Sequence, residues 1–385
     1  MSFLTKPPRG IITPEEFIIL SAELHYILSD EGNDEALAAL VIGSANFPEM
    51  ELLIMAINCL RLGYGESRRK MGPLAVLHPL RTAAILARSM HEPHLLDVLG
   101  ALFHDKEEDL TLSKLGAKQS GEFESAYQNL ILEIDPNHRW FLGERVAIFC
   151  RRDDDSYGTY IERLIAHSYR MPDLLHTKLA DRLDNTFDLH LSRPGVTRFN
   201  FYRTVFDILF LENFPGINVE EYHALPPDSR LVLLLSQLFK DAIFLNSLRR
   251  SGRDQQDQTV GTLFDAVAVA GIREAQWIAF ELFASDIPDP KRQRALLLKT
   301  MEYCYHGGAQ EIHEPSDLNE LDGSFAYYYG GPDDKTRKRH LAELCQDREK
   351  LIQVVLTFIA LFSSFLNDPK CYLRGLEDST VQFGQ

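Results

Sequence analysis

The sequence has few cysteines and no closely spaced pair of them. The five it has are odd in number and scattered over 385 residues: Cys59, Cys150, Cys304, Cys345 and Cys371. A disulfide framework usually has an even number of cysteines, and a zinc site of paired cysteines needs two that lie close together in the sequence. We therefore expect free thiols, packed in the reducing environment of the cytoplasm.

Positive charge and long apolar runs are also scarce. The 40 Lys and Arg are outnumbered by 56 Asp and Glu, which gives a net charge of -16. A surface that neutralises nucleic-acid phosphates needs a positive field, so we expect no nucleic-acid partner. The apolar stretch 351–366 is shorter than the roughly 18 to 20 residues of a membrane-spanning helix. Residues 1–17 contain no secretory signal pattern. These absences predict a cytoplasmic protein without a membrane partner.

The alternating apolar pattern of half-buried strands is nearly absent. Apolar residues instead recur at three- and four-residue intervals, as amphipathic helices require, in 15–29, 50–64, 79–90, 92–104, 159–168, 172–189, 230–248, 262–284 and 337–366. The sequence therefore predicts an all-α fold. Its length exceeds the size at which one hydrophobic core usually stops growing, which favours two domains.

A His-Asp pair, His104 and Asp105, ends the apolar segment LLDVLGALFH. Upstream, His78 opens another predicted helix, and downstream Asp181 lies in KLADRLDN. Taken singly, His78 or Asp181 is more often a satisfied polar residue or a helix cap than a metal ligand. As an ordered set from three helices, they suit a divalent transition metal such as manganese or iron. Such an ion lowers the pKa of bound water and polarises a phosphoryl oxygen, which is the chemistry of phosphoester hydrolysis.

Three segments, RKMGPLAVLHPLRTAAILA, ALFHDKEEDL and KLADRLDN, resemble the motifs RK-x-G-x-P, HP, HD-x-x-ED and K-x-ADRxxN of RelA/SpoT-type alarmone hydrolases. The resemblance covers residues 55–190, about a third of the chain. It implies an HD-domain helical bundle. With SRPG at 192–195 as the boundary, we expect this domain at 1–195 and a second helical domain of unknown role at 196–385.

The resemblance also implies a role for each matching residue. Manganese, Mn²⁺, would be bound by His78, His104, Asp105 and Asp181, and the attacking water would be positioned or deprotonated by Glu108 and Asp109. A purine nucleotide would be contacted by Arg69, Lys70 and Asn185. The implied reaction removes the 3'-pyrophosphate of a guanosine alarmone such as (p)ppGpp, the messenger of the stringent response.

Departures from the family pattern leave the nucleotide open. Tyr64 and Ser67 stand in the segment where the family usually has His and Gln, and the usual HDVVEDT is here HDKEEDL. The segment KEED at 106–109, which contains Glu108 and Asp109, also has the composition of a solvated helix end. The alternatives are an HD phosphohydrolase for another nucleotide, namely an adenosine alarmone, a dinucleotide cofactor or a nucleotide monophosphate, and a nucleotide sensor without turnover.

Overall fold

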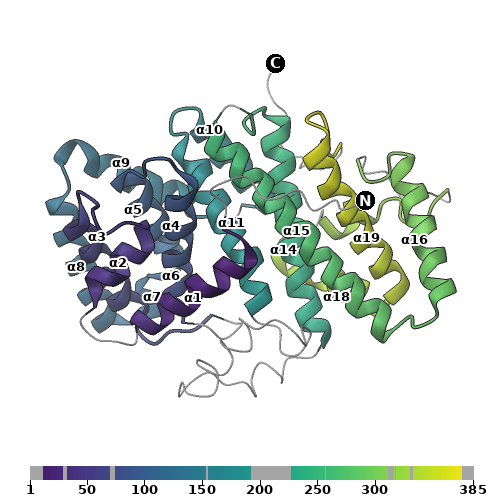
Figure 1. Ribbon diagram of the computed structural model, residues 1–385, viewed down its shortest axis with the longest axis horizontal. Coiled ribbons are helices and arrows are strands. Elements are labelled where there is room, and N and C mark those ends of the chain that lie inside the picture. The colour runs from purple at the N-terminus through teal and green to yellow at the C-terminus, as the bar shows by residue number, and fades with distance from the viewer. Residues whose placement is uncertain are drawn as a thin grey trace. The chain divides into compact units, whose positions relative to one another are not determined.

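The computed structural model describes residues 12–28, 33–69, 74–152, 155–191, 227–255, 257–310, 316, 318–329 and 333–374. All secondary-structure elements in these ranges are helices (Figure 1), apart from one isolated β-bridge between Arg68 and Leu74. The predicted all-α fold is confirmed. The chain divides into two compact units, Met1–Arg152 with Ala166–His223 and Asp153–Ile165 with Ala224–Gln385. The domain boundary predicted at 195 lies outside the described residues.

The first unit is a bundle around two central helices, α4 (Leu77–Ser89) and α5 (Leu95–Phe103). The surrounding helices are α1 (Pro14–Leu28), α2 (Asp34–Ile42), α3 (Met50–Tyr64), α6 (Lys106–Asp109), α7 (Leu112–Leu115), α8 (Ala117–Glu133), α9 (Pro136–Phe149) and α11 (Asp173–Leu191). Of these, α1, α2 and α11 pack on α4, while α3, α9 and α11 pack on α5. Helix α10 (Tyr157–Ser168) begins in the second unit and ends in the first.

Burial of α4 and α5 places polar residues in the interior of the first unit. Residues 77–87 of α4 are all buried, and α5 is buried from Asp97 to its end. A helix covered on all sides has no solvated face, so its polar side chains must find partners within the protein. His78 and Arg81 of α4 are two such residues. Pro79 lies in the first turn of α4, where its missing N–H has no helical partner to lose.

The second unit has two long helices, α15 (Gln258–Ser285) and α19 (Arg348–Asn367), that lie side by side (Figure 1). Gly271 allows their approach, because a Cβ there would lie 3.0 Å from the ring of Phe362. The other described helices are α14 (Pro227–Arg250), α16 (Pro290–Tyr305), α17 (Ser324–Tyr329) and α18 (Asp334–Gln346). The segment predicted at 337–366 is thus two helices, and Asp347 between them caps α19 by accepting the Lys350 N–H.

Two helices of the described chain are long and apolar enough to cross a membrane. They are Ser229–Arg250 within α14 and Arg348–Asn367, which is α19. More than half of each apolar window is buried inside the protein. α19 is longer than the apolar run at 351–366, because Arg348, Glu349 and Lys350 precede the run in the helix and Asn367 follows it.

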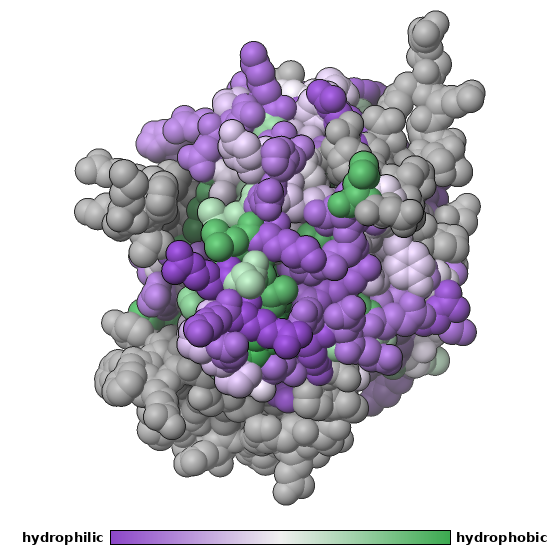
Figure 2. All heavy atoms as spheres, turned by 90° about the vertical axis from the view of Figure 1, so that its right-hand side faces the viewer, coloured by the Kyte–Doolittle hydropathy of each residue, from purple (hydrophilic) through white to green (hydrophobic). Residues whose placement is uncertain are grey.

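Helix α16 carries exposed apolar side chains at Leu298, Met301 and Tyr305, spaced three and four residues apart. Figure 2 shows the face on this side, where a few hydrophobic residues gather among mostly hydrophilic ones. Single exposed apolar residues are normal on soluble surfaces, so this row by itself assigns no role to the face.

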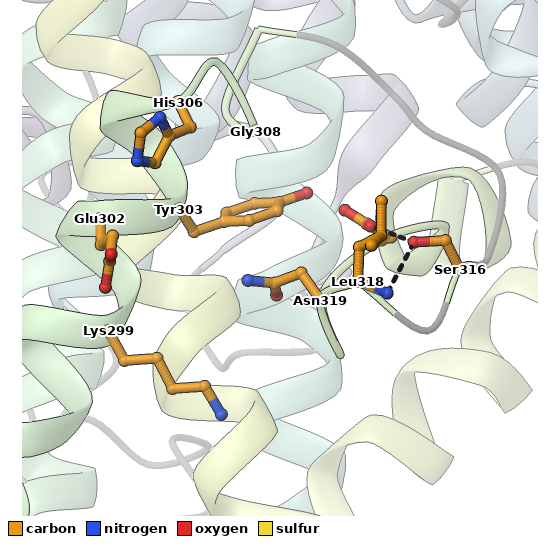
Figure 3. A pocket seen from close by; sticks show the side chains of 9 residues that line it. Lys299, Glu302, Tyr303, His306, Gly308, Ser316, Leu318 and Asn319 are labelled. Carbon is orange, nitrogen blue, oxygen red and sulfur yellow. Dashed lines mark hydrogen bonds between the residues drawn. The ribbon is translucent and has the colours of Figure 1, made fainter.

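A neighbouring face of α16 lines a cavity of about 670 Å³ together with residues of the segment 316–322 (Figure 3). The ring of Tyr303 points from α16 toward Ser316. Gly308 makes room for this ring, since a Cβ there would come within 2.3 Å of it. The described residues that line the cavity include none of the site residues predicted from the sequence.

Candidate metal centre

The turn between α5 and α6 presents the His-Asp pair. His104 directly follows α5, and its Nδ1–H donates to the carbonyl oxygen of Ala101 at 2.7 Å. The proton on Nδ1 leaves the lone pair on Nε2. Asp105 directly precedes α6, and its carbonyl oxygen accepts the N–H groups of Glu108 and Asp109 at 3.1 and 2.7 Å. The backbone therefore fixes both members of the pair.

Four predicted ligands converge on one point. The Nε2 atoms of His78 and His104 are 3.2 Å apart. His78 Nε2 lies 3.3 Å from Asp105 Oδ2 and 3.2 Å from Asp181 Oδ1. The Nε2 of His104 lies 3.3 Å from an Asp105 oxygen and 3.6 Å from Asp181 Oδ1.

These separations fit a shared ion. Donor atoms held about 2.1 Å from one metal in tetrahedral or octahedral geometry lie about 3.0 to 3.4 Å from each other. Potential ligand atoms of His78, His104 and Asp105 all lie within 4.8 Å of one another, and Asp181 approaches both imidazoles. Two nitrogens and two carboxylates suit Mn²⁺ or another divalent transition metal. The residues therefore have the chemistry and the spacing of a metal centre.

One of the four candidate ligands is partly exposed. The side chains of His78, His104 and Asp181 are buried, whereas that of Asp105 is 25% exposed. A catalytic metal needs protein ligands on most sides and a position that water or substrate can reach. The side of Asp105 is where such access exists.

In the metal-free centre the two imidazoles are held protonated and the two carboxylates are held ionised. Burial lowers the pKa of the His78 imidazole, but hydrogen bonds to Asp105, Asp181 and Asp184 outweigh it and raise that pKa to about 9. Burial also acts against protonated His104, yet the carboxylates, led by Asp105, raise its pKa well above the ordinary value. Burial raises the pKa values of Asp105 and Asp181, and the cations beside them hold both well below the usual range. Protons on the imidazoles therefore compete with a metal ion.

Metal affinity is expected to rise with pH. His78 has a folded pKa of about 9, above its ordinary 6.5, so its proton stabilises the metal-free fold below pH 6.5 and this contribution is lost as the pH rises through about 9. Binding Mn²⁺ must displace such protons, which gives about a tenfold gain in affinity per pH unit for each proton released. Calorimetry in buffers of different ionisation enthalpy measures the affinity for Mn²⁺ and the number of protons released on binding. An affinity that stays constant over this pH range would show that the imidazoles are not ligands.

Behind His78 lies a buried charge network that the sequence motifs do not contain. The Nδ1–H of His78 donates to Asp184 Oδ2 at 2.6 Å. Arg81 Nε donates to Asp184 Oδ1 and its Nη2 to Asp188 Oδ1, both at 2.7 Å. Arg81 also lies 5.0 Å from the centre of the Phe17 ring on α1. Arg81 and Asp184 are both 0% exposed, so the network joins α4 to α11 in the interior.

Loss of Arg81 is expected to destabilise the first unit strongly. Arg81→Met leaves the carboxylates of Asp184 and Asp188 buried without this partner, which costs about 3 to 5 kcal/mol. Arg61→Met is the control, because the partly exposed pair of Arg61 with Asp34 contributes at most about 1 kcal/mol. Thermal and denaturant unfolding of the two variants measures the difference. Equal stability would mean that the network does not support the fold.

Three predicted site residues meet on α11 and the segment before α4. Asn185 Nδ2 donates to Asp181 Oδ1 at 2.5 Å, and its Oδ1 accepts from Arg69 Nη2 at 2.8 Å. Lys178 Nζ lies 2.7 Å from the other oxygen of Asp181. The guanidinium of Arg69 also lies 3.2 Å from Asp188, and the side chain is 27% exposed. Arg69 and Asn185 thus lie beside the metal ligands, while Lys70 lies outside the described residues.

Glu108 and Asp109 lie on α6, next to Asp105, in different surroundings. Glu108 Oε1 accepts the backbone N–H of Arg151 at 2.8 Å. Burial raises the pKa of Glu108, and this N–H bond only partly opposes the effect. Asp109 pairs instead with Lys114 at 2.7 Å, and its side chain is 41% exposed. Of the two carboxylates, Glu108 has the more base-like environment.

Lys106 and Tyr64, which depart from the family pattern, are both buried. Lys106 is buried, with its Nζ 4.8 Å from the centre of the Tyr127 ring and 3.0 Å from carboxylate oxygens of Glu107 and Glu124. Tyr64 is buried at the end of α3, and burial, followed by the charge of Asp105, raises its pKa. Lys106 therefore anchors α6 to α8, whereas Tyr64 lies near the carboxylates of the candidate centre.

Comparison of the chain with protein-family models, with curated proteins and with solved structures gives no match in any of the three.

Proposed function

We propose that the first unit is a metal-dependent HD-type phosphohydrolase that removes the 3'-pyrophosphate of a guanosine alarmone such as (p)ppGpp. The observation that carries the proposal is the convergence of His78, His104, Asp105 and Asp181 at metal-ligand spacing. The motif resemblance supports the choice of reaction, since Glu108 and Asp109 follow these ligands as the family pattern requires.

The four ligands would hold Mn²⁺ or another divalent transition metal, which when bound supplies Lewis acidity to water and to a phosphoryl oxygen. In the proposed reaction water adds to the phosphorus attached to the 3'-oxygen, and the bond to that oxygen breaks. Pyrophosphate and a nucleoside 5'-phosphate are the products.

The chain's own residues have distinct tasks in this reaction. Glu108 accepts a proton from the attacking water, a task that suits a carboxylate whose pKa burial raises. Asp109, beside it on α6, orients that water. Lys178 and Arg69 lie next to Asp181 and its neighbour Asn185, where their charges can meet phosphate oxygens.

Another nucleotide is the second candidate substrate, because the surroundings of Arg69 do not select one purine over another. Its guanidinium contacts Asn185 and Asp188, so a purine that stacks on it must share or replace these contacts. Stacking tolerates any purine, so an adenosine alarmone, a dinucleotide cofactor or a nucleotide monophosphate is an alternative substrate. A nucleotide sensor without turnover is the third reading, and retention of Glu108 beside all four ligands argues against it.

Arg69→Ala and Asn185→Ala are expected to raise KM for a 3'-pyrophosphorylated guanosine nucleotide. Loss of a stacked or charged contact of about 1 to 2 kcal/mol corresponds to a rise in KM of about 5- to 30-fold. Arg61→Ala is the control, because it removes one arginine charge at a position where the side chain pairs with Asp34.

The assay is a panel of guanosine and adenosine 3'-pyrophosphates, dinucleotide cofactors, deoxynucleoside triphosphates and nucleotide monophosphates with Mn²⁺, read by phosphate or pyrophosphate release. Highest kcat/KM for a guanosine 3'-pyrophosphate supports the proposal. Preference for a monophosphate or a triphosphate, with KM unchanged in Arg69→Ala, would instead support the second candidate.

A further inference from the structure

One metal-ligand candidate has a carboxylate directly behind it. His78 faces the other ligands with Nε2, and its Nδ1 lies 2.6 Å from Asp184 Oδ2. His104 has a backbone carbonyl in the equivalent place, that of Ala101. The two imidazoles are therefore held by partners of different charge.

We propose that Asp184, fixed by Arg81, is the positioning residue that orients His78 for metal binding. The inference rests on the metal site of the proposed function and extends it to residues outside the ligand set. Arg81 lies two residues beyond the HP motif, and Asp184 occupies a position of K-x-ADRxxN where no residue type is specified.

Hydrogen bonding to Asp184 selects the useful tautomer of His78. An imidazole carries its single proton on either nitrogen, and only the unprotonated nitrogen can bind a metal. A carboxylate at 2.6 Å from Nδ1 holds the proton there, which places the lone pair on Nε2. That nitrogen is the one within 3.3 Å of Asp105 and Asp181. The negative charge of Asp184 also makes the imidazole a stronger electron donor.

Arg81 keeps Asp184 in place and charged. Its Nε and Nη2 donate to the two oxygens of Asp184 at 2.7 and 3.2 Å, an arrangement that sets the plane of the carboxylate. A buried carboxylate without such a partner would be costly. Because Arg81 follows His78 by three residues on α4, and Asp184 follows Asp181 by three on α11, each helix supplies one ligand and one supporting residue.

Asp188 offers a matched control within the same network. It is buried and pairs with Arg81 at 2.7 Å, as Asp184 does, but it lies one further turn along α11. Asp184→Asn and Asp188→Asn therefore remove the same charge from the same buried arginine. A structural role alone predicts similar effects for the two variants, whereas a positioning role predicts a loss of metal affinity in Asp184→Asn only.

The experiment measures the Mn²⁺ dissociation constant of the full chain by the paramagnetic resonance signal of free Mn²⁺, with helical content as the check on folding. Asp184→Asn is expected to weaken binding about 10- to 100-fold, the range for removing an outer partner of a ligand histidine. Asp188→Asn is expected to stay close to wild type. Equal dissociation constants for the two variants would overturn the inference.

A second measurement uses the wild type and does not depend on a variant that folds. With Zn²⁺ bound, proton–nitrogen correlation spectra of the imidazole side chains, with the His78 signal assigned through bonds to its own backbone resonances, should show the proton of His78 on Nδ1. A proton on Nε2 would overturn the inference. Neither measurement needs turnover, so a protein that binds Mn²⁺ but hydrolyses no nucleotide would contradict the proposed function and leave this test intact.

Discussion

Replacement of His104 by alanine is expected to remove bound metal and turnover together. The imidazole is buried, and its Nε2 lies 3.2 Å from that of His78 and 3.3 Å from Asp105. Alanine leaves a gap where the nitrogen was, and Asp105 and Asp181 each lose a cationic partner that helps to hold them charged. Elemental analysis after manganese loading should find about one ion per wild-type chain and none in the variant.

His94→Ala is the matched control for this prediction. His94 is an exposed residue just before α5, whereas His104 follows the other end of the same helix. The control is expected to retain metal and turnover, and a chelator should abolish turnover in wild type and control alike. Retention of metal by His104→Ala at the wild-type level would show that the ion, if any, binds elsewhere.

Glu108→Gln is expected to reduce kcat about a hundredfold or more while metal content and fold stay unchanged, because it removes general-base help. The amide keeps the shape of the side chain and can still accept the Arg151 N–H, so the turn after α9 remains attached to α6. Asp109→Asn is expected to lose activity as well, and the pairing with Lys114 predicts that its loss is the smaller one.

Glu107→Gln is the control on the same four-residue helix. Glu107 is half-exposed and pairs with Lys106, so its charge is not expected to contribute to turnover. Rates and metal content must be measured on the same preparations. If Glu108→Gln turns over at the wild-type rate, KEED is only a solvated helix end, as its composition alone would allow.

Helices with a strong apolar period could be predicted from the sequence, and those with a weak one could not. Residues 50–64 were expected to be helical and form α3 with those bounds. Helix α8 has buried residues at Phe123, Tyr127 and Leu130, but the polar residues between them and Gly121 before them conceal the pattern. In α9 the buried face includes Arg145, which pairs with Asp173 of α11. A charged residue on a buried face cancels the periodicity that signals a helix.

The clustering of His78, His104, Asp105 and Asp181 could be predicted because their types and order are distinctive, but the residues behind them could not. Arginine and aspartate usually lie on the surface, so the sequence does not mark Arg81 and Asp184 as buried. Only the packing of α4 against α11 makes them buried partners. The surroundings of Arg69 depend on Asn185 and Asp188, which lie 116 and 119 residues further along the chain. Local sequence does not report contacts over such separations.

Pyrophosphate release from guanosine 5'-diphosphate 3'-diphosphate by the chelator-treated protein, measured with and without added Mn²⁺, tests the proposed activity most directly. The predicted result is release of pyrophosphate and guanosine diphosphate in equal amounts, only with Mn²⁺ present. No release at any Mn²⁺ concentration, from a folded protein shown to bind the metal, would contradict the assignment of this site to alarmone hydrolysis.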